Sequence, residues 1–185
     1  MLEYLALGMV LYEPLTGYDV KKEIEAGVGN FYTASYGSLY PALKKLTSKG
    51  YLSMTEQQQG SRLKKYYKST DLGKAEFLEW LSAPLDQSLS IASHMARIYF
   101  YDELPVSTRK RLLKEYEAYY QQLLQKYHKM EKRLAKIAMN DEYYEMSTLY
   151  LGIQHLQDNI RWLKFIRKQN HFQDLFGKIR QESSK

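Results

Sequence analysis

The residues best suited to do chemistry in this sequence are basic, and they gather in one stretch. Between Lys44 and Lys68 the chain carries seven lysines and arginines and a single acidic residue, Glu56. Residues 1–82 as a whole are nearly neutral, with ten basic and nine acidic residues. A local positive patch on a nearly neutral domain is typical of proteins that bind the phosphate backbone of nucleic acid. A solvated basic face without a partner has the same charge, so charge alone does not separate the two.

Catalytic and metal-binding patterns are weak in comparison. Glu142 and Glu145 form a carboxylate pair three residues apart, but we expect the pair to lie at an acidic, solvated helix start. The chain has no cysteine, which is consistent with a reducing compartment. We therefore expect no enzyme, no cofactor and no metal site. The histidines are scattered, without the helical spacing of metal ligands: His94, His128, His155 and His171.

Membrane insertion is not expected either. No apolar run approaches the ~20 residues that span a bilayer. The first residues are apolar but lack a basic segment and a small-residue cleavage site, so they do not read as a signal peptide. The composition, with 44% hydrophobic and 26% charged residues, is that of an ordinary folded protein. We expect a cytoplasmic protein with no membrane partner.

Periodicity in residues 1–82 predicts a winged helix-turn-helix domain. A buried helix ends near Pro14, a second runs from a Thr16 cap to about Ala26, and a third covers about 35–49. Alternating residues at 51–56 and a basic, aromatic run at 63–70 predict two strands joined by a polar loop at 57–61. A further helix follows at 71–81. The expected fold class is mainly α with a small β-hairpin.

Pro41 leaves the start of the third helix open. If Ser35 is the cap, Pro41 lies inside the helix and should kink it. If Ser38 is the cap, Pro41 lies in the first turn, where no helical hydrogen bond is lost. The sequence does not decide between the two.

Residues 83–185 are predicted to form a helical dimerisation domain that can also hold an effector. After a linker at 84–90 and a short helix at 90–101, two long apolar stripes with alternating three- and four-residue spacing follow, separated by Asn140 and Asp141. Two such stripes joined by a short loop predict an antiparallel helical hairpin, and its surplus apolar surface predicts a homodimer. The predicted interface residues are Leu113, Tyr116, Tyr120, Leu123, Tyr127, Leu149, Ile153, Leu156 and Ile160.

The third helix has the features of a recognition helix. Small residues at its start let backbone amides approach a phosphate, and in a helix-turn-helix this end of the second helix of the motif enters the major groove. The basic strand can contact the DNA backbone or the adjacent minor groove, although lysines also protect exposed strand edges. The predicted contacts with double-stranded DNA are Ser35, Tyr36, Gly37, Ser38, Tyr40, Lys44, Arg62, Lys64 and Lys65.

Several stretches resemble the PadR family of bacterial transcriptional regulators. They are LTGYDVKK at 15–22, YGSLYPALKKL at 36–46, GYL at 50–52, GSRLKKYYK at 60–68 and TDLG at 70–73. The GSLYPAL core is the most specific of them. The segment MARIYF at 95–100, placed before a long hairpin, is similar to the longer, virulence-activator-like branch of the family.

The resemblance implies a cytoplasmic dimer that binds a palindromic operator, usually represses, and often responds to a small aromatic or lipophilic ligand. Arg97, His155 and Trp162 are possible effector residues that could line a pocket between subunits, although such residues are more often ordinary core or interface positions.

Two rival functions remain. One is a winged-helix adaptor for protein interactions, and the other is a small-molecule-binding protein without a primary DNA role.

Overall fold

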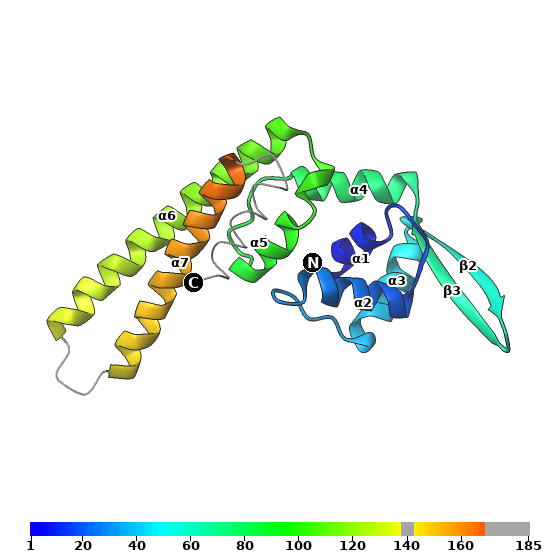
Figure 1. The fold of residues 1–185 in the computed structure, drawn as a ribbon, viewed down its shortest axis with the longest axis horizontal. Coiled ribbons are helices and arrows are strands. Elements are labelled where there is room, and N and C mark those ends of the chain that lie inside the picture. The colour runs from blue at the N-terminus through cyan, green and yellow to red at the C-terminus, as the bar shows by residue number, and fades with distance from the viewer. Residues whose placement is uncertain (138–142, 169–185) are drawn as a thin grey trace, which may run out of the picture. The chain divides into compact units, whose positions relative to one another are not determined.

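The computed structural model describes residues 1–137 and 143–168, and it is mainly helical with one small antiparallel sheet (Figure 1). The predicted break at Asn140 and Asp141 lies outside the described residues. The elements are α1 (Leu2–Met9), β1 (Leu15–Thr16), α2 (Gly17–Val28), α3 (Tyr36–Ser48), β2 (Leu52–Gln59), β3 (Arg62–Ser69), α4 (Asp71–Ser82), α5 (Ile91–Ile98), the 3-10 turn η1 (Tyr101–Glu103), α6 (Val106–Ile137) and α7 (Tyr143–Lys168).

The chain divides into two compact units. The first is Met1–Pro105, and the second begins at Val106. Helix α5 therefore lies with the first unit, beyond residue 82, where we expected the DNA-binding domain to end. The two units are described separately below. Within the described residues, no helix is long and apolar enough to cross a membrane.

The core of the first unit is formed by α1 to α4. Leu5, Ile24, Leu43 and Phe77, one from each of these helices, are fully buried. Helix α1 contacts α2, α3 and α4, which explains why its residues are apolar on nearly every side. The predicted order of helix, helix, helix, strand, strand, helix is confirmed, and this arrangement is a winged helix-turn-helix.

Helix α2 continues further than predicted. Thr16 caps it by accepting a hydrogen bond from the backbone N–H of Asp19 at 3.2 Å, as expected. We expected the helix to end at about Ala26, but α2 continues through Gly27 to Val28. A Cβ at Gly27 would lie 2.7 Å from the ring of Tyr99, so this glycine gives room to a packed aromatic ring.

The sheet differs from the predicted hairpin in two respects. A third strand, β1, pairs with β3 through Leu15 opposite Tyr67 and Thr16 opposite Tyr66. The expected loop at 57–61 is also shorter, because residues 57–59 continue β2 and pair with β3 down to Gln59 opposite Arg62. Only residues 60 and 61 form the turn, and Gly60 adopts φ +61° there. The long β2–β3 hairpin extends away from the helices as a wing (Figure 1).

The start of α3 is settled in favour of Ser35 as the cap. Its side chain accepts a hydrogen bond from the backbone N–H of Ser38 at 3.2 Å, and Pro41 lies inside the helix. Because proline has no N–H, the carbonyl of Gly37 loses its usual helical partner. At the other end Gly50, with φ +74°, closes the helix.

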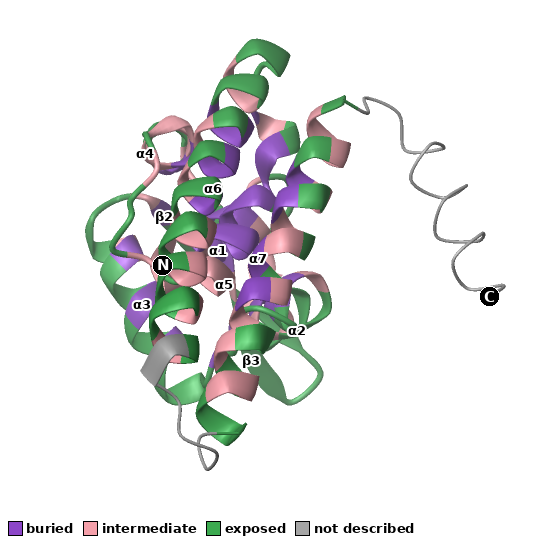
Figure 2. Ribbon diagram, turned by 90° about the vertical axis from the view of Figure 1, so that its left-hand side faces the viewer, coloured by how far each residue is buried: buried purple, intermediate pink, exposed green. Residues whose placement is uncertain are grey.

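The second unit is an antiparallel hairpin of α6 and α7, and its buried residues lie within 112–120 of α6 and 153–163 of α7 (Figure 2). The helices approach closely at Gly152, where a Cβ would lie 2.9 Å from the ring of Tyr127. Six of the nine residues predicted for the dimer interface are buried in a single chain and the other three are half-buried, so the dimer role of this seam stays a prediction. The six are Leu113, Tyr116, Tyr120, Ile153, Leu156 and Ile160.

The segment between α4 and α5 is held by two side chains of α5. His94 is 1% exposed and its Nε2 lies 2.9 Å from the carbonyl oxygen of Asp86. Arg97 is 3% exposed and lies against the Trp80 ring, 5.4 Å from its centroid. Its guanidinium donates hydrogen bonds to four backbone carbonyls near the end of α4: those of Trp80, Leu81, Ala83 and Pro84.

His94 should make stability depend on pH. Burial lowers the pKa of His94 below its usual value, so below about pH 6.5 the unfolded chain binds more protons at this site than the folded one. The contribution of His94 to the free energy of unfolding is therefore fully present above that pH. It is lost as the pH falls, by at most about 1.4 kcal/mol per pH unit. Urea unfolding at pH 7.5 and 5.5 should show a smaller acid loss in His94→Gln than in the wild type. His128→Gln removes a half-buried histidine of α6 that lies 3.0 Å from Glu131 and should keep the full loss, and an equal loss in all three proteins would contradict the assignment.

Candidate nucleic-acid interface

Three tyrosines form an exposed ladder across α2 and α3. The ring centroids of Tyr18 and Tyr36 are 6.3 Å apart, and those of Tyr36 and Tyr40 are 6.2 Å apart, with interplanar angles of 14° and 24°. These side chains are 42% to 60% exposed. The Nζ of Lys21 lies 4.8 Å from the Tyr36 centroid, a cation–π contact. The ladder is a rigid surface that ends in phenolic hydroxyls, which suits recognition of a polar partner.

The glycine at the start of α2 places the last ring of this ladder. A Cβ at Gly17 would lie 2.6 Å from Cε1 of Tyr40. The absence of a side chain at Gly17 therefore lets the Tyr40 ring lie against the first turn of α2. This contact ties the orientation of α3 to that of α2, as a helix-turn-helix requires.

The first turn of α3 is small and polar. Ser35 and Ser38 bond to each other through their hydroxyls at 2.9 Å, and Gly37 between them has no protein atom crowding the position of a Cβ. All three residues are exposed. The positive end of the helix dipole is thus open to an approaching phosphate.

The cations on this surface differ in how they are paired. Lys65 lies 3.5 Å from Glu56 across the hairpin, and Lys45 donates to Glu3 at 2.6 Å. In contrast, the described part of the chain provides no ion-pair partner for Lys44, Arg62 or Lys64. These three exposed side chains keep their full charge for an external anion.

A hollow of about 510 Å³ joins α2, α3 and the wing. Tyr40, Lys64 and Lys65 from the predicted set line it, together with Tyr18 and Leu63, which the sequence analysis did not select. Leu63 is 57% exposed, a large apolar residue between basic ones on the wing. The GYD sequence at 17–19 was the available signal for Tyr18, whereas nothing in the sequence distinguished Leu63 from a core residue.

The nine predicted DNA contacts therefore lie on α3, its cap and the wing. Tyr40, Lys64 and Lys65 share the hollow, Tyr36 adjoins Tyr40 in the ladder, and Lys44 follows one helical turn after Tyr40. Their role in DNA binding stays a prediction. Among the described residues no cluster of histidine, aspartate and glutamate could hold a metal ion.

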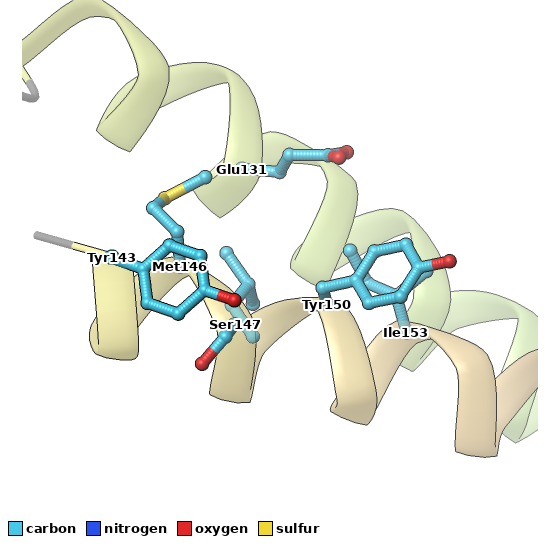
Figure 3. Close-up of a pocket in the computed structure, with 7 residues that line it drawn as sticks. Glu131, Tyr143, Met146, Ser147, Tyr150 and Ile153 are labelled. Atoms are coloured by element: carbon cyan, nitrogen blue, oxygen red, sulfur yellow. The ribbon is translucent and has the colours of Figure 1, made fainter.

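The possible effector residues are not brought together. Arg97 donates its hydrogen bonds to backbone carbonyls within the first unit. His155 is exposed and Trp162 half-buried on α7. A hollow of about 370 Å³ lies elsewhere on the hairpin, between the end of α6 and the start of α7 (Figure 3). It is lined by Glu131, Tyr143, Met146, Ser147, Leu149, Tyr150 and Ile153.

Two family models match consecutive parts of the chain. Residues 6–79 match the transcriptional regulator PadR-like family, and residues 93–169 match the virulence activator alpha C-terminal family. The boundary between the matches lies near the expected domain boundary at residue 82, whereas the compact units divide at Pro105. The domain boundary therefore stays a proposal.

Individual relatives agree with the family models. The negative transcriptional regulator PadR of Bacillus subtilis is 30% identical over 148 residues, which are 78% of this chain and 74% of that protein. The probable transcriptional regulator Rv1176c of Mycobacterium tuberculosis is 30% identical over 71 residues, 38% of each chain. A crystal structure of B. subtilis PadR with operator DNA covers 90% of this chain and 96% of that one, with 25% identity and a TM-score of 0.45.

These matches extend over both predicted domains, and they agree with the resemblance found in the motifs. They also confirm the expectation of a regulator rather than an enzyme. The chain belongs to the PadR-like family of transcriptional regulators.

Proposed function

We propose that the protein is a dimeric repressor that binds a palindromic operator in double-stranded DNA. Each subunit inserts the start of α3 into a major groove, and the wing contacts the adjacent backbone. The observation that carries the proposal is the single surface that combines the tyrosine ladder, the open start of α3 and the unpaired cations. Aromatic and hydroxyl groups contact bases, while unpaired cations bind phosphates.

The relative from B. subtilis supports the same proposed function. The B. subtilis protein is called a negative transcriptional regulator, and one of its crystal structures contains operator DNA. Two-fold symmetric dimers bind half-sites about one helical turn, ~34 Å, apart. We propose this arrangement for two copies of the present chain, held together by their α6–α7 hairpins.

We further propose that a small aromatic or lipophilic molecule regulates binding. B. subtilis PadR has also been crystallised with p-coumaric acid. In the present chain the hollow of Figure 3 offers apolar and phenolic side chains from Met146, Tyr143 and Tyr150. A thermal shift with a panel of phenolic acids tests this part, and a ligand that raises the melting temperature should also release bound DNA.

Tyr40→Phe should test whether the ladder reads sequence. The ring and its packing against Gly17 remain, but the hydroxyl that we assign to a base edge is lost, which should cost about 1–3 kcal/mol of discrimination, on the order of a tenfold loss. Mobility shifts should compare the promoter next to the protein's own gene with an unrelated duplex. Binding to the promoter should weaken while binding to the unrelated duplex stays the same.

Tyr12→Phe is the matched control, because Tyr12 is exposed and its hydroxyl donates to Glu103, away from the ladder and outside both hollows. It should leave both affinities unchanged. Equal losses on both duplexes for Tyr40→Phe would mean that the hydroxyl contacts only the backbone. No shift with either duplex at low salt would overturn the proposed function.

A further inference from the structure

An exposed leucine on the basic wing is the feature of the first unit that charge does not explain. Leu63 of β3 is 57% exposed and pairs across the wing with Gln58. Its neighbours in the chain, Arg62 and Lys64, have no ion-pair partner in the described part of the protein. Single exposed leucines are common, so the surroundings of Leu63 decide what it can contact.

Leu63 lies on the face of the wing that is continuous with the core. Side chains alternate along a strand, so Leu63 shares a face with Lys65 and Tyr67. Tyr67, at the base of the wing, is only 8% exposed. Further out, where the wing extends away from the helices (Figure 1), Leu63 lines the same hollow as Tyr18 and Tyr40. The leucine therefore borders the same space as the tyrosine ladder.

This hollow is nearly neutral, although the surface around it is basic. Its lining includes one carboxylate, that of Asp19, and two lysines. Lys65 is paired with Glu56 at 3.5 Å, which leaves Lys64 and Asp19 with opposite charges. The Thr16 hydroxyl donates to the Asp19 carboxylate at 2.6 Å and fixes its position.

The lining disfavours a phosphate inside the hollow. A phosphate there would lie in the same space as the Asp19 carboxylate, and like charges repel. It would also lose hydration against the Leu63 side chain, which offers no hydrogen bond in return. The aromatic rings of Tyr18 and Tyr40 instead offer apolar surface. The hollow therefore fits an uncharged group with apolar surface.

Operator DNA provides such a group at this position. In the proposed function α3 enters a major groove while the wing contacts the adjacent backbone, so the strand that borders the groove passes between α3 and the wing. The hollow lies there, because its lining comes from α2, α3 and β3. A DNA strand alternates anionic phosphates with deoxyribose sugars, whose C–H surface is largely apolar. A sugar inside the hollow leaves the phosphates on either side of it to the surrounding cations.

We propose that the hollow binds a deoxyribose of the strand between α3 and the wing, and that Leu63 packs against this sugar. The inference rests on the proposed DNA binding and adds to it a contact that salt does not screen. Every nucleotide of DNA has the same sugar, so the contact fixes the position of the wing on the strand without reading sequence. The cations and Leu63 then bind alternate groups of one backbone.

Leu63→Ala should show a combination of effects that no charged or base-reading contact gives. Affinity for the promoter next to the protein's own gene and for an unrelated duplex should fall equally, on the order of tenfold, because each leucine of a dimer loses apolar contact. The slope of log affinity against log salt should stay as in the wild type, because no charge changes. Leu63→Met keeps the apolar contact and should bind within about twofold of the wild type.

Leu72→Ala is the matched control, because Leu72 of α4 is also 57% exposed and does not line the hollow. It should leave both affinities unchanged, and urea unfolding should show wild-type stability for both alanine variants. A loss confined to the promoter would place Leu63 against a base edge and overturn the inference. Unchanged affinities in Leu63→Ala would overturn it and leave the proposed function intact. A wild-type protein that binds neither duplex at low salt would remove both.

Hydroxyl-radical cleavage of the labelled promoter gives an independent readout, because the radical attacks deoxyribose C–H bonds that solvent can reach. At saturating protein, the wild type should protect sugars of the bound strand in each half-site. Leu63→Ala should restore cleavage at a subset of these sugars, whereas Leu72→Ala should keep the full protection. Identical footprints for Leu63→Ala and the wild type would contradict the inference.

Discussion

Raising the salt concentration from about 50 mM to about 200 mM is expected to weaken operator binding about a thousandfold, because bound phosphates release counterions in proportion to their number. Each subunit offers three cations without an ion-pair partner among the described residues: Lys44, Arg62 and Lys64. A dimer doubles that number, which reaches the lower end of the range for which such a loss is typical. Fluorescence anisotropy with a labelled operator at four salt concentrations measures the slope of log affinity against log salt.

Single substitutions should change that slope by predictable amounts. Lys64→Ala removes two phosphate contacts per dimer and should reduce the slope by about 1.8. Glu56→Gln should act in the opposite direction, because it releases Lys65 from the ion pair across the wing. Lys132→Ala, on an exposed position of α6, carries the same loss of charge outside the proposed interface and should leave the slope nearly unchanged.

Opposite effects of Lys64→Ala and Glu56→Gln cannot result from a general loss of folding. A slope that is insensitive to both would mean that the wing does not contact phosphates. In that case the basic residues of the hairpin act only as protection of an exposed sheet edge.

The order of helices in the first unit could be predicted because each buries one apolar stripe, and such stripes are visible as a period of 3.6 residues. The wing was predicted too short because part of it shows no such periodic pattern. Gln57, Gln58 and Gln59 are exposed on both faces of the hairpin, so polarity does not alternate along them. Their strand conformation comes from pairing with β3, and pairing leaves no local pattern in one strand.

Strand β1 could not be predicted for a related reason. Two residues, Leu15 and Thr16, are too few to show any period, and their conformation depends on Tyr66 and Tyr67, about fifty positions later. The candidate DNA-binding surface was likewise predictable only in part. The cap, the tyrosines of α3 and the basic wing were visible in the sequence, whereas the place of Tyr18 in the ladder depends on how α2 and α3 cross.

Arg97 shows the limit of sequence reasoning most clearly, since an arginine in an apolar segment suggested a ligand contact. Its partners are backbone carbonyls from residues 80 to 84. Every residue has a backbone carbonyl, so the sequence gives no sign of which ones act as acceptors. The end of α4 carries the negative end of the helix dipole, so a buried cation there is stabilised without a carboxylate. The guanidinium joins the end of α4, the linker and α5 in one network.

Arg97→Met should therefore destabilise the first unit by about 3 kcal/mol, because it leaves several backbone carbonyls without their donor while keeping most of the side-chain volume. Urea unfolding followed by circular dichroism measures the loss. Arg133→Met, on an exposed position of α6, should change stability by less than about 0.5 kcal/mol. Arg97→Lys should be intermediate, because an ammonium keeps the charge but cannot span the same set of acceptors. A ligand-binding role predicts the reverse: an unchanged free energy of unfolding together with a lost response to the effector. The two measurements on one variant separate a structural arginine from a sensing one.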